Sequence, residues 1–160
     1  MTAIQTLHKV VELAQKRRDE ALASLTQLQR ELLAAQEQMD QLQAYAAEAQ
    51  QRWSARGATG VDPMLLHHHR QFMQKIDHAM EFQRGVLSNR EALVQQGQQQ
   101  VHVAERDLAG LRKYTDGKVQ ALLQKAQRQE QKATDELALS IHLRQSLAQA
   151  QSLAAAGGRS

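Results

Sequence analysis

Apolar residues follow one another at alternating steps of four and three between Leu7 and Trp53. An average spacing of about 3.5 residues keeps one seam of a helix turned toward a partner that winds around it with left-handed supercoil. No Pro or Gly interrupts the stretch, so an unbroken helix is expected there. One helix cannot bury this seam alone, so the rest of the chain or another molecule must cover it. Thirteen of the fourteen positions are apolar, and the full set is Leu7, Val11, Ala14, Arg18, Ala21, Leu25, Leu28, Leu32, Ala35, Met39, Leu42, Ala46, Ala49 and Trp53.

Arg18 is the charged position of this seam, where a charge costs stability. We expect it to lie at a frayed open end of the helix pair or to meet an acid across the seam. The first helix is expected to begin near Thr2 or Thr6.

Composition favours long helices over a globular core. The 160 residues include only five Trp, Tyr and Phe residues and one Pro, and they are rich in Ala, Leu and Gln. The net charge of +3, with acids and bases interspersed, is too small to argue for nucleic acid binding. The absence of Cys excludes disulfides and thiolate metal sites. Without a secretory signal or an apolar run of about 18 residues, a cytoplasmic protein is expected, which does not exclude docking at a membrane machine.

A turn between Gly57 and Asp62 is expected to separate two helices. Gly57 fits the left-handed position that closes a helix after Arg56. Asp62 as N-cap and Pro63 as the first helical residue would start the second helix. A connection this short makes the two helices antiparallel neighbours.

The second helix has no firm stop before Gly157, and its seam is poorer than that of the first. One row of every seventh residue is mostly apolar and the other is half polar, which is compatible with a two-stranded pair whose better half is the first helix. The apolar row is Met73, Met80, Leu87, Val94, Val101, Leu108, Thr115 and Leu122. The half-polar row is Ile76, Gln83, Arg90, Gly97, Ala104, Leu111 and Lys118.

The two helices are expected to differ in length. At a rise of about 1.5 Å per residue they would span roughly 80 Å and 140 Å, so the first ends opposite about residue 110 and leaves about forty residues unpaired. Such an amphipathic end is expected to dock on a partner or to be a marginal helix without one. Its broken apolar face contains Val119, Leu122, Ala126, Ala133, Leu137, Leu143, Leu147 and Ala150.

Candidate chemistry is sparse. Adjacent residues of a helix point about 100° apart, so His67, His68 and His69 cannot converge on one metal, and polar surface near the turn is expected instead. No phosphate-binding loop, nucleophile elbow or zinc-protease motif occurs, and a two-helix pair offers no pocket that excludes water. We therefore expect no enzyme, no catalytic residues, no metal site and no cofactor.

Aromatic residues gather near the predicted turn. Trp53 is expected in the core because it lies on the seam, whereas Tyr45 lies off it. For Phe72, two interpretations stay open: it forms an exposed partner patch with Ile76 and Ala79, or it packs with them into the seam.

Basic residues are in surplus in the first part of the expected overhang. They form either a solvated face or a positive surface that meets an acidic partner cavity. The residues are Arg112, Lys113, Lys118, Lys125, Arg128 and Lys132, against Asp116 and Glu130.

Two segments resemble the FliJ family of flagellar type III export proteins. One is HRQFMQKIDHA over residues 69–79, shortly after the turn, and the other is RQEQKATDE over residues 128–136. The layout is also similar, with Tyr45 near the end of a first helix, a Gly-containing turn and a longer second helix. The resemblance covers nearly the whole chain.

The resemblance implies a coiled-coil stalk similar to the central stalk of rotary ATPases, with roles in flagellum biogenesis, protein transport, motility and chemotaxis. It implies insertion of the open end of the coiled coil into the ring of the export ATPase FliI, contact with the export gate protein FlhA and with export chaperones, and peripheral association with the inner-membrane export apparatus. The gate-binding residues implied are Met39, Leu42, Tyr45, Phe72, Ile76 and Ala79. The ATPase-facing residues assigned are Arg128, Gln131, Lys132, Asp135 and Glu136.

The predicted architecture is all-α: a monomeric, long two-helix antiparallel coiled-coil hairpin with a C-terminal helical overhang. A single domain is expected over residues 1–160, with helices over about 3–56 and 63–155 and a turn over 57–62. The alternative function is a generic coiled-coil scaffold that self-associates through the overhang. A nucleic-acid-binding helical protein is disfavoured by the weak charge and the scarcity of exposed aromatic residues.

Overall fold

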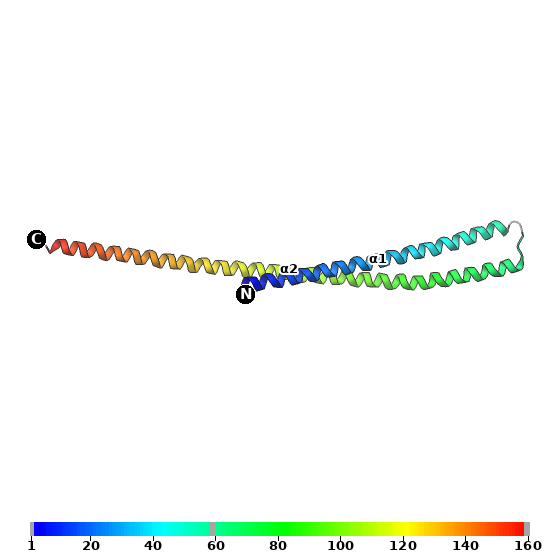
Figure 1. Cartoon of the computed structure of the whole chain (residues 1–160), viewed down its shortest axis with the longest axis horizontal. Coiled ribbons are helices and arrows are strands. Elements are labelled where there is room, and N and C mark those ends of the chain that lie inside the picture. The colour runs from blue at the N-terminus through cyan, green and yellow to red at the C-terminus, as the bar shows by residue number, and fades with distance from the viewer. Residues whose placement is uncertain (1, 58–59, 159–160) are drawn as a thin grey trace. The chain divides into compact units, whose positions relative to one another are not determined.

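Two long helices make up the secondary structure in a computed structural model that describes residues 2–57 and 60–158. Helix α1 spans Ala3–Gly57 and helix α2 spans Pro63–Gly157 (Figure 1). No strand occurs among the described residues. The prediction of an all-α helical hairpin is confirmed.

The chain has two compact units, and both helices contribute to each. One unit is Lys9–Gly110 and the other combines Met1–His8 with Leu111–Ser160. The expectation of a single domain over residues 1–160 stays a prediction.

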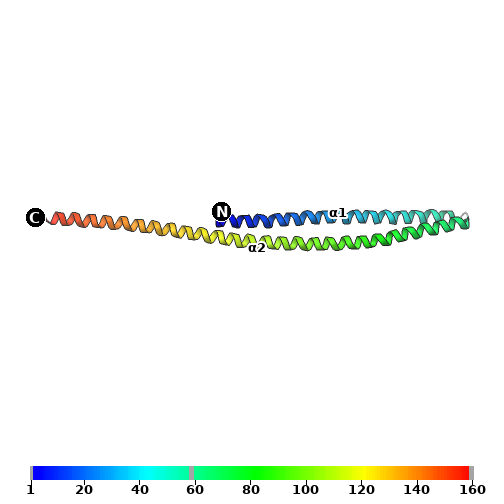
Figure 2. The same ribbon diagram turned by 60° about the horizontal axis from the view of Figure 1, so that its bottom comes forward.

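The Lys9–Gly110 unit is an antiparallel pair, with α1 and α2 side by side in both views (Figures 1 and 2). The contacts between the helices show this antiparallel register, because residue numbers fall along α1 as they rise along α2. Near the turn, the rings of Trp53 and His69 stack with centroids 4.3 Å apart. Farther from it, a Cβ added at Gly97 would meet the side chains of Leu28 and Leu25 at 3.0 and 3.3 Å.

The 4-3 ladder of α1 forms the seam of this unit. Every ladder position from Val11 to Trp53 is buried or half-buried, while most residues between them are exposed. The apolar row of α2 is covered likewise from Met73 to Leu108. Removing these side chains from water is the main favourable contribution to the pairing.

The half-polar row of α2 is also covered from Ile76 to Ala104, and it is accommodated by specific contacts. The Gln83 side chain, 4% exposed, donates a hydrogen bond from Nε2 to the backbone oxygen of Ala35 at 2.8 Å. The Arg90 guanidinium lies 3.8 Å from the Glu31 carboxylate across the pair. These contacts let a row with polar members face the apolar ladder without leaving the Gln83 amide unsatisfied.

Both sequence-based expectations for Arg18 were wrong. Its guanidinium pairs with the neighbouring Asp19, with Nη2 and Nε at 3.0 and 3.1 Å from the same carboxylate oxygen. The aliphatic stem of a long basic side chain can cover apolar surface while its charged head reaches toward water. With its side chain 27% exposed, Arg18 therefore stays on the seam with its charge satisfied from its own helix.

Gly97 is the glycine whose lack of a side chain matters for the pairing. A Cβ at Gly97 would crowd the side chains of Leu25 and Leu28, whereas a Cβ at Gly85 of the same helix would meet nothing within 4 Å. We expect Gly97→Leu to lower the free energy of unfolding by about 1–3 kcal/mol through overpacking. Gly85→Leu should raise it by about 0.5–1 kcal/mol, because Leu favours helix more than Gly does.

Urea denaturation followed by circular dichroism measures both changes. Equal effects of Gly85→Leu and Gly97→Leu would contradict the close approach of the helices at Gly97. The Gly85 variant serves as the matched control because both glycines lie in α2 within the same unit.

The start of α2 is as the sequence predicts, but the end of α1 is not. Asp62 caps α2 as predicted, since its carboxylate accepts a hydrogen bond from the backbone N–H of Met64 at 3.1 Å, and Pro63 is the first helical residue. The assignment of the left-handed position to Gly57 was wrong. Helix α1 runs through Gly57, and Gly60 has the positive φ, at 90°. Ala58 and Thr59, within the predicted turn, lie outside the described residues.

In the second unit, α1 begins with a reciprocal cap. The Thr2 hydroxyl accepts from the Gln5 backbone N–H at 3.2 Å, and the Gln5 side-chain oxygen accepts from the Thr2 N–H at 3.1 Å. This is a capping box, which satisfies two backbone donors that a helix start otherwise leaves unpaired.

Burial in the second unit extends further along α2 than expected. Thr115 is 2% exposed, and Leu111 and Val119 are half-buried. The expectation that pairing ends near residue 110 was therefore wrong, and the fully exposed part begins later. Every described residue from 121 to 158 is exposed. We call residues 121–157 the distal segment.

Candidate functional site

Two aromatic side chains of the Lys9–Gly110 unit are candidates for contact with a partner. Tyr45 of α1 is 58% exposed and Phe72 of α2 is 48% exposed. Tyr45 lies just off the ladder, between the seam residues Leu42 and Ala46, and Phe72 precedes the seam residue Met73. Their flank positions explain why both are presented to solvent. Exposed aromatic rings are typical anchors of protein interfaces.

The other residues implied for the gate surface lie deeper. Met39 and Ile76 are buried, at 4% and 7% exposure, and Leu42 and Ala79 are half-buried. Neither of the two interpretations left open for Phe72 holds in full. The exposed patch was wrong for Ile76, which occupies the row of α2 that faces the ladder, and packing into the seam was wrong for Phe72, which is exposed. Tyr45 and Phe72 are thus the members of this set whose side chains a partner can reach directly.

A groove in the same unit lies next to Phe72, close to the turn. It has a volume of about 330 Å³ and is lined by Ala49, Arg52, Trp53, Arg56, Leu65, His68, His69 and Phe72. Its wall on α1 follows from helical spacing: Tyr45, Ala49, Arg52 and Arg56 succeed one another at steps of four and three, so they share one face. The groove therefore continues the exposed Tyr45 face toward the turn.

Trp53 and His69 form the inner part of this groove. Their rings are almost parallel, with an interplanar angle of 6°, and both residues are half-buried. Trp53 was expected in the core, and it does lie on the seam while also lining the groove. The expectation of His67, His68 and His69 as polar surface was wrong for His69, which packs against an aromatic face.

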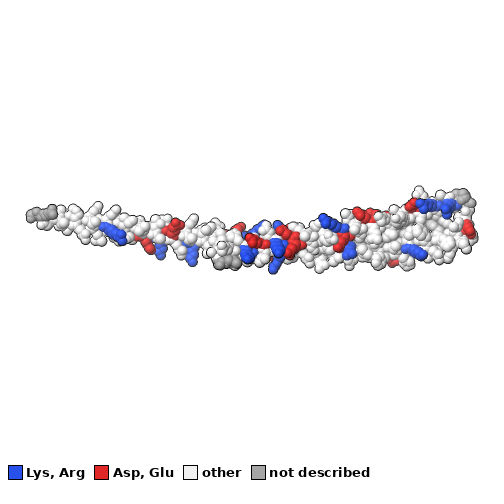
Figure 3. All heavy atoms as spheres, in the orientation of Figure 1, with Lys and Arg blue, Asp and Glu red and all other residues white. Residues whose placement is uncertain are grey.

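Arginines form the rim of the groove. Figure 3 shows Lys and Arg side chains together over the end of α1 next to the turn. Arg52 pairs with Glu48 one turn earlier, with Nη2 to Oε1 at 2.6 Å. Sequence reasoning missed Arg52, Arg56 and Leu65. The 4-3 succession from Tyr45 was the available signal for the arginines, but Leu65 required the register between the helices.

The residues assigned to the ATPase lie on the distal segment of the other unit. Arg128, Gln131, Lys132, Asp135 and Glu136 are all exposed. The Gln131 amide donates to the Asp135 carboxylate at 3.0 Å. This pair holds polar groups on one side of the helix.

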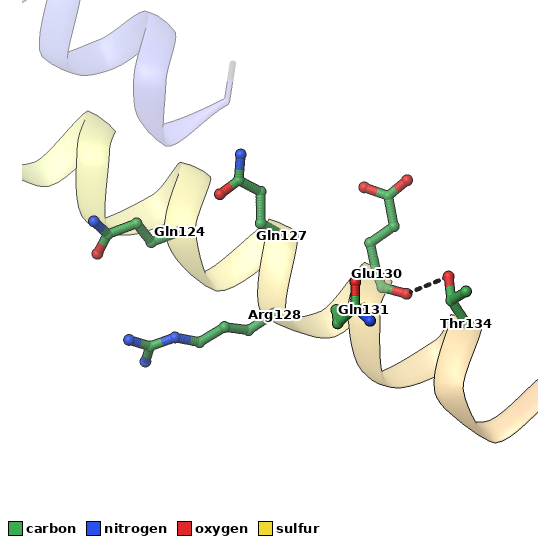
Figure 4. Close-up of a pocket in the computed structure, with 6 residues that line it drawn as sticks. All are labelled: Gln124, Gln127, Arg128, Glu130, Gln131 and Thr134. Carbon is green, nitrogen blue, oxygen red and sulfur yellow. Dashed lines mark hydrogen bonds between the residues drawn. The ribbon is translucent and has the colours of Figure 1, made fainter.

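A shallow hollow lies beside these residues, and its lining comes from α2 alone. Figure 4 shows the side chains splayed around a single helix, with the Thr134 hydroxyl donating to the Glu130 backbone oxygen at 2.9 Å. A surface of this kind cannot enclose a small ligand, but it can lie against a complementary partner. The lining residues are Gln124, Gln127, Arg128, Glu130, Gln131 and Thr134.

The last part of the distal segment is apolar and exposed. Among the described residues from 137 to 158, Arg144 is the one Lys, Arg, Asp or Glu. Six large aliphatic side chains there are each about half exposed or more: Leu137, Leu139, Ile141, Leu143, Leu147 and Leu153. So many exposed large aliphatic side chains on one helix favour association with a partner.

No group of three or more His, Cys, Asp or Glu among the described residues is arranged to hold a metal ion. Neither α1 nor α2, over the residues that the structure describes, contains a stretch long and apolar enough to cross a bilayer.

Comparison with known families decides the relationship. The family model described as "Flagellar FliJ protein" matches residues 3–147. The chain belongs to the FliJ family. The match includes all of α1, the groove next to the turn and much of the distal segment, so it covers both surfaces described above.

Membership in the FliJ family relates the chain to flagellar export. The resemblance recognised in residues 69–79 and 128–136 is confirmed, since both segments lie within the match. No curated protein sequence matches the chain.

Proposed function

We propose that this FliJ-family chain is a coiled-coil stalk of the flagellar export apparatus that binds the export ATPase FliI and links it to the gate protein FlhA and to export chaperones. In this proposal it is not an enzyme, takes no cofactor and does not bind nucleic acid. It acts in the cytoplasm, at the periphery of the inner-membrane apparatus.

The observation that carries the proposal is the contrast along α2. Up to Val119, α2 has buried or half-buried residues at regular intervals. In the distal segment every described residue is exposed, although the segment contains several leucines. A helix gains little stability from propensity alone, so an exposed amphipathic helix calls for another surface. Because the chain belongs to the FliJ family, we infer that this other surface is part of the export machinery.

The charges of the distal segment support an ATPase contact. Arg128 and Lys132 lie one turn apart and both are exposed, close to Asp135 and Glu136. Mixed charges on an exposed helix face give orientation and register when they meet a complementary partner. The second exposed surface, around Tyr45 and Phe72, belongs to the other unit, which fits a linker that contacts two components.

Deleting the gene from its native bacterium is expected to abolish or strongly reduce swimming and the export of flagellar subunits. Complementation with the full chain should restore both, because the defect would lie in export. Soft-agar swimming and immunoblots of secreted subunits measure the effect. Normal secretion in the deletion strain would refute the proposed function.

The alternative is a generic scaffold that self-associates through the distal segment, and the exposed leucines favour it as a second candidate. Sedimentation velocity over a range of concentrations separates the two. A monomer at all concentrations supports the stalk, whereas a dimer that dissociates when Leu143 and Leu147 are replaced by Ser supports the scaffold.

A further inference from the structure

The groove next to the turn combines an apolar floor with a cationic rim. Trp53, Leu65 and Phe72 supply apolar surface, and Arg52 and Arg56 supply permanent positive charge. The remaining lining residues are Ala49, His68 and His69, so the lining contains no carboxylate. This composition selects a ligand with negative charge beside an apolar group.

The carboxylates of Glu48 and Asp62, close to the groove in the sequence, do not abolish its preference for a negatively charged ligand. Glu48 pairs with Arg52 in an exposed i,i+4 contact, and such pairs contribute little stability, so an incoming carboxylate can compete for the guanidinium. The Asp62 carboxylate accepts from the backbone of Met64 as the cap of α2. Arginine binds carboxylates in a planar fork that fixes orientation as well as charge.

The size of the groove restricts the occupant further. A volume of about 330 Å³ is at the lower end of ligand sites, which suits one or two side chains of an extended segment rather than a folded domain. Single-stranded nucleic acid binding depends on a basic groove that tracks many phosphates, and here the permanent charges in the lining are two.

We propose that this groove binds an acidic linear peptide segment that carries one apolar anchor side chain. The anchor packs against Leu65 and Phe72 beside the stacked Trp53 and His69 rings, and flanking Asp or Glu side chains pair with Arg52 and Arg56. The proposal deepens the proposed function and rests on it, because Phe72 belongs both to the groove and to the exposed gate-contact pair. The acidic segment would belong to a protein component of the export apparatus.

The chain offers a built-in reporter for this binding. Trp53 is its single Trp, and it lines the groove. A ligand that enters the groove changes the environment of that indole directly, so its fluorescence reports the site itself.

The test uses the full chain and a fluorescein-labelled peptide in which Asp and Glu flank a central Leu. Binding is followed by fluorescence anisotropy, and Trp53 emission is measured with an unlabelled copy. Control peptides replace the acids by Lys or the Leu by Ser, and a labelled single-stranded oligodeoxynucleotide is a further control. Arg52→Gln with Arg56→Gln removes the rim charge. Arg30→Gln with Arg84→Gln removes the same charge from exposed positions outside the groove lining.

The acidic peptide is expected to bind and to shift Trp53 emission. The Arg52 and Arg56 double variant should bind about tenfold more weakly, since two exposed charge pairs are lost, and the difference should shrink as salt rises. The Arg30 and Arg84 variant should keep its affinity within about twofold. Circular dichroism of each variant establishes that the helices are intact.

Three outcomes would overturn the proposal: no binding of the acidic peptide, equal binding of the Lys peptide or the oligonucleotide, or equal loss in both double variants. If the peptide binds as expected but the deletion strain exports normally, the proposed function fails and the chemistry of the groove stands. If export requires the chain but the peptide does not bind, the groove proposal alone fails.

Discussion

Replacing Tyr45 and Phe72 together by Ala is expected to weaken binding to the gate protein FlhA by about thirtyfold or more. The two rings are the most accessible members of the gate set, at 58% and 48% exposure. Truncation of aromatic anchors at an interface commonly costs about 2 kcal/mol or more, which corresponds to that factor. Isothermal titration calorimetry with the purified soluble domain of the gate protein measures the change. Because both side chains lie on the flank of the helix pair, the melting temperature should change little.

Matched variants separate a contact effect from a folding effect. Leu33→Ala with Phe82→Ala removes two exposed apolar side chains, one from each helix of the same unit, and should leave gate binding intact. Ile76→Ala, at a buried position, should instead lower stability by about 2–5 kcal/mol. Unchanged affinity of the Tyr45 and Phe72 variant, or an equal loss in the Leu33 and Phe82 variant, would contradict a gate surface at the two aromatic residues.

The helix pairing could be predicted from the sequence because its cause is local and repeated. From Val11 to Trp53 every rung of the ladder is buried or half-buried in the structure, and the cap at Asp62 follows from one carboxylate and one Pro. Hydrophobic spacing of this kind specifies which face of a helix is covered without knowledge of the partner.

Polar positions on the seam were harder to predict because their outcome depends on single contacts. Gln83 is buried since its amide reaches the Ala35 backbone across the pair, and Arg18 stays on the seam since Asp19 follows it. A residue's type does not reveal which of these contacts forms. Pairing extends to Val119 rather than ending near residue 110 for a related reason. The burial of Thr115 and the half-burial of Val119 depend on the register between the two helices.

The candidate surfaces were predictable to different degrees. Tyr45 could be placed off the seam from spacing alone, whereas the two interpretations of Phe72 and Ile76 needed the structure, which separates an exposed ring from a buried aliphatic. The groove was missed because its walls come from α1 and α2, and one-dimensional periodicity does not show which residues of two helices face each other.

Amide hydrogen exchange is expected to divide α2 near Val119. Residues up to that point should be protected in the free protein, since the seam regularly buries members of both helices. The distal segment should exchange rapidly, because all its residues are exposed and an unsupported helix opens readily. Adding the export ATPase FliI should slow exchange in the distal segment by more than about tenfold, because binding stabilises the helical state.

Charge reversal then tests whether the basic residues of the distal segment guide that association. Arg128→Glu with Lys132→Glu should slow association with FliI, and the effect should shrink as salt rises, because attraction between exposed charges is screened. Arg30→Glu with Arg84→Glu changes the net charge equally in the other unit and should leave the rate nearly unchanged. Protection of the distal segment in the free monomer would mean that it already has an internal partner, against the exposure seen here. Absence of protection with saturating FliI would remove the mechanical basis of the stalk and favour the self-associating scaffold.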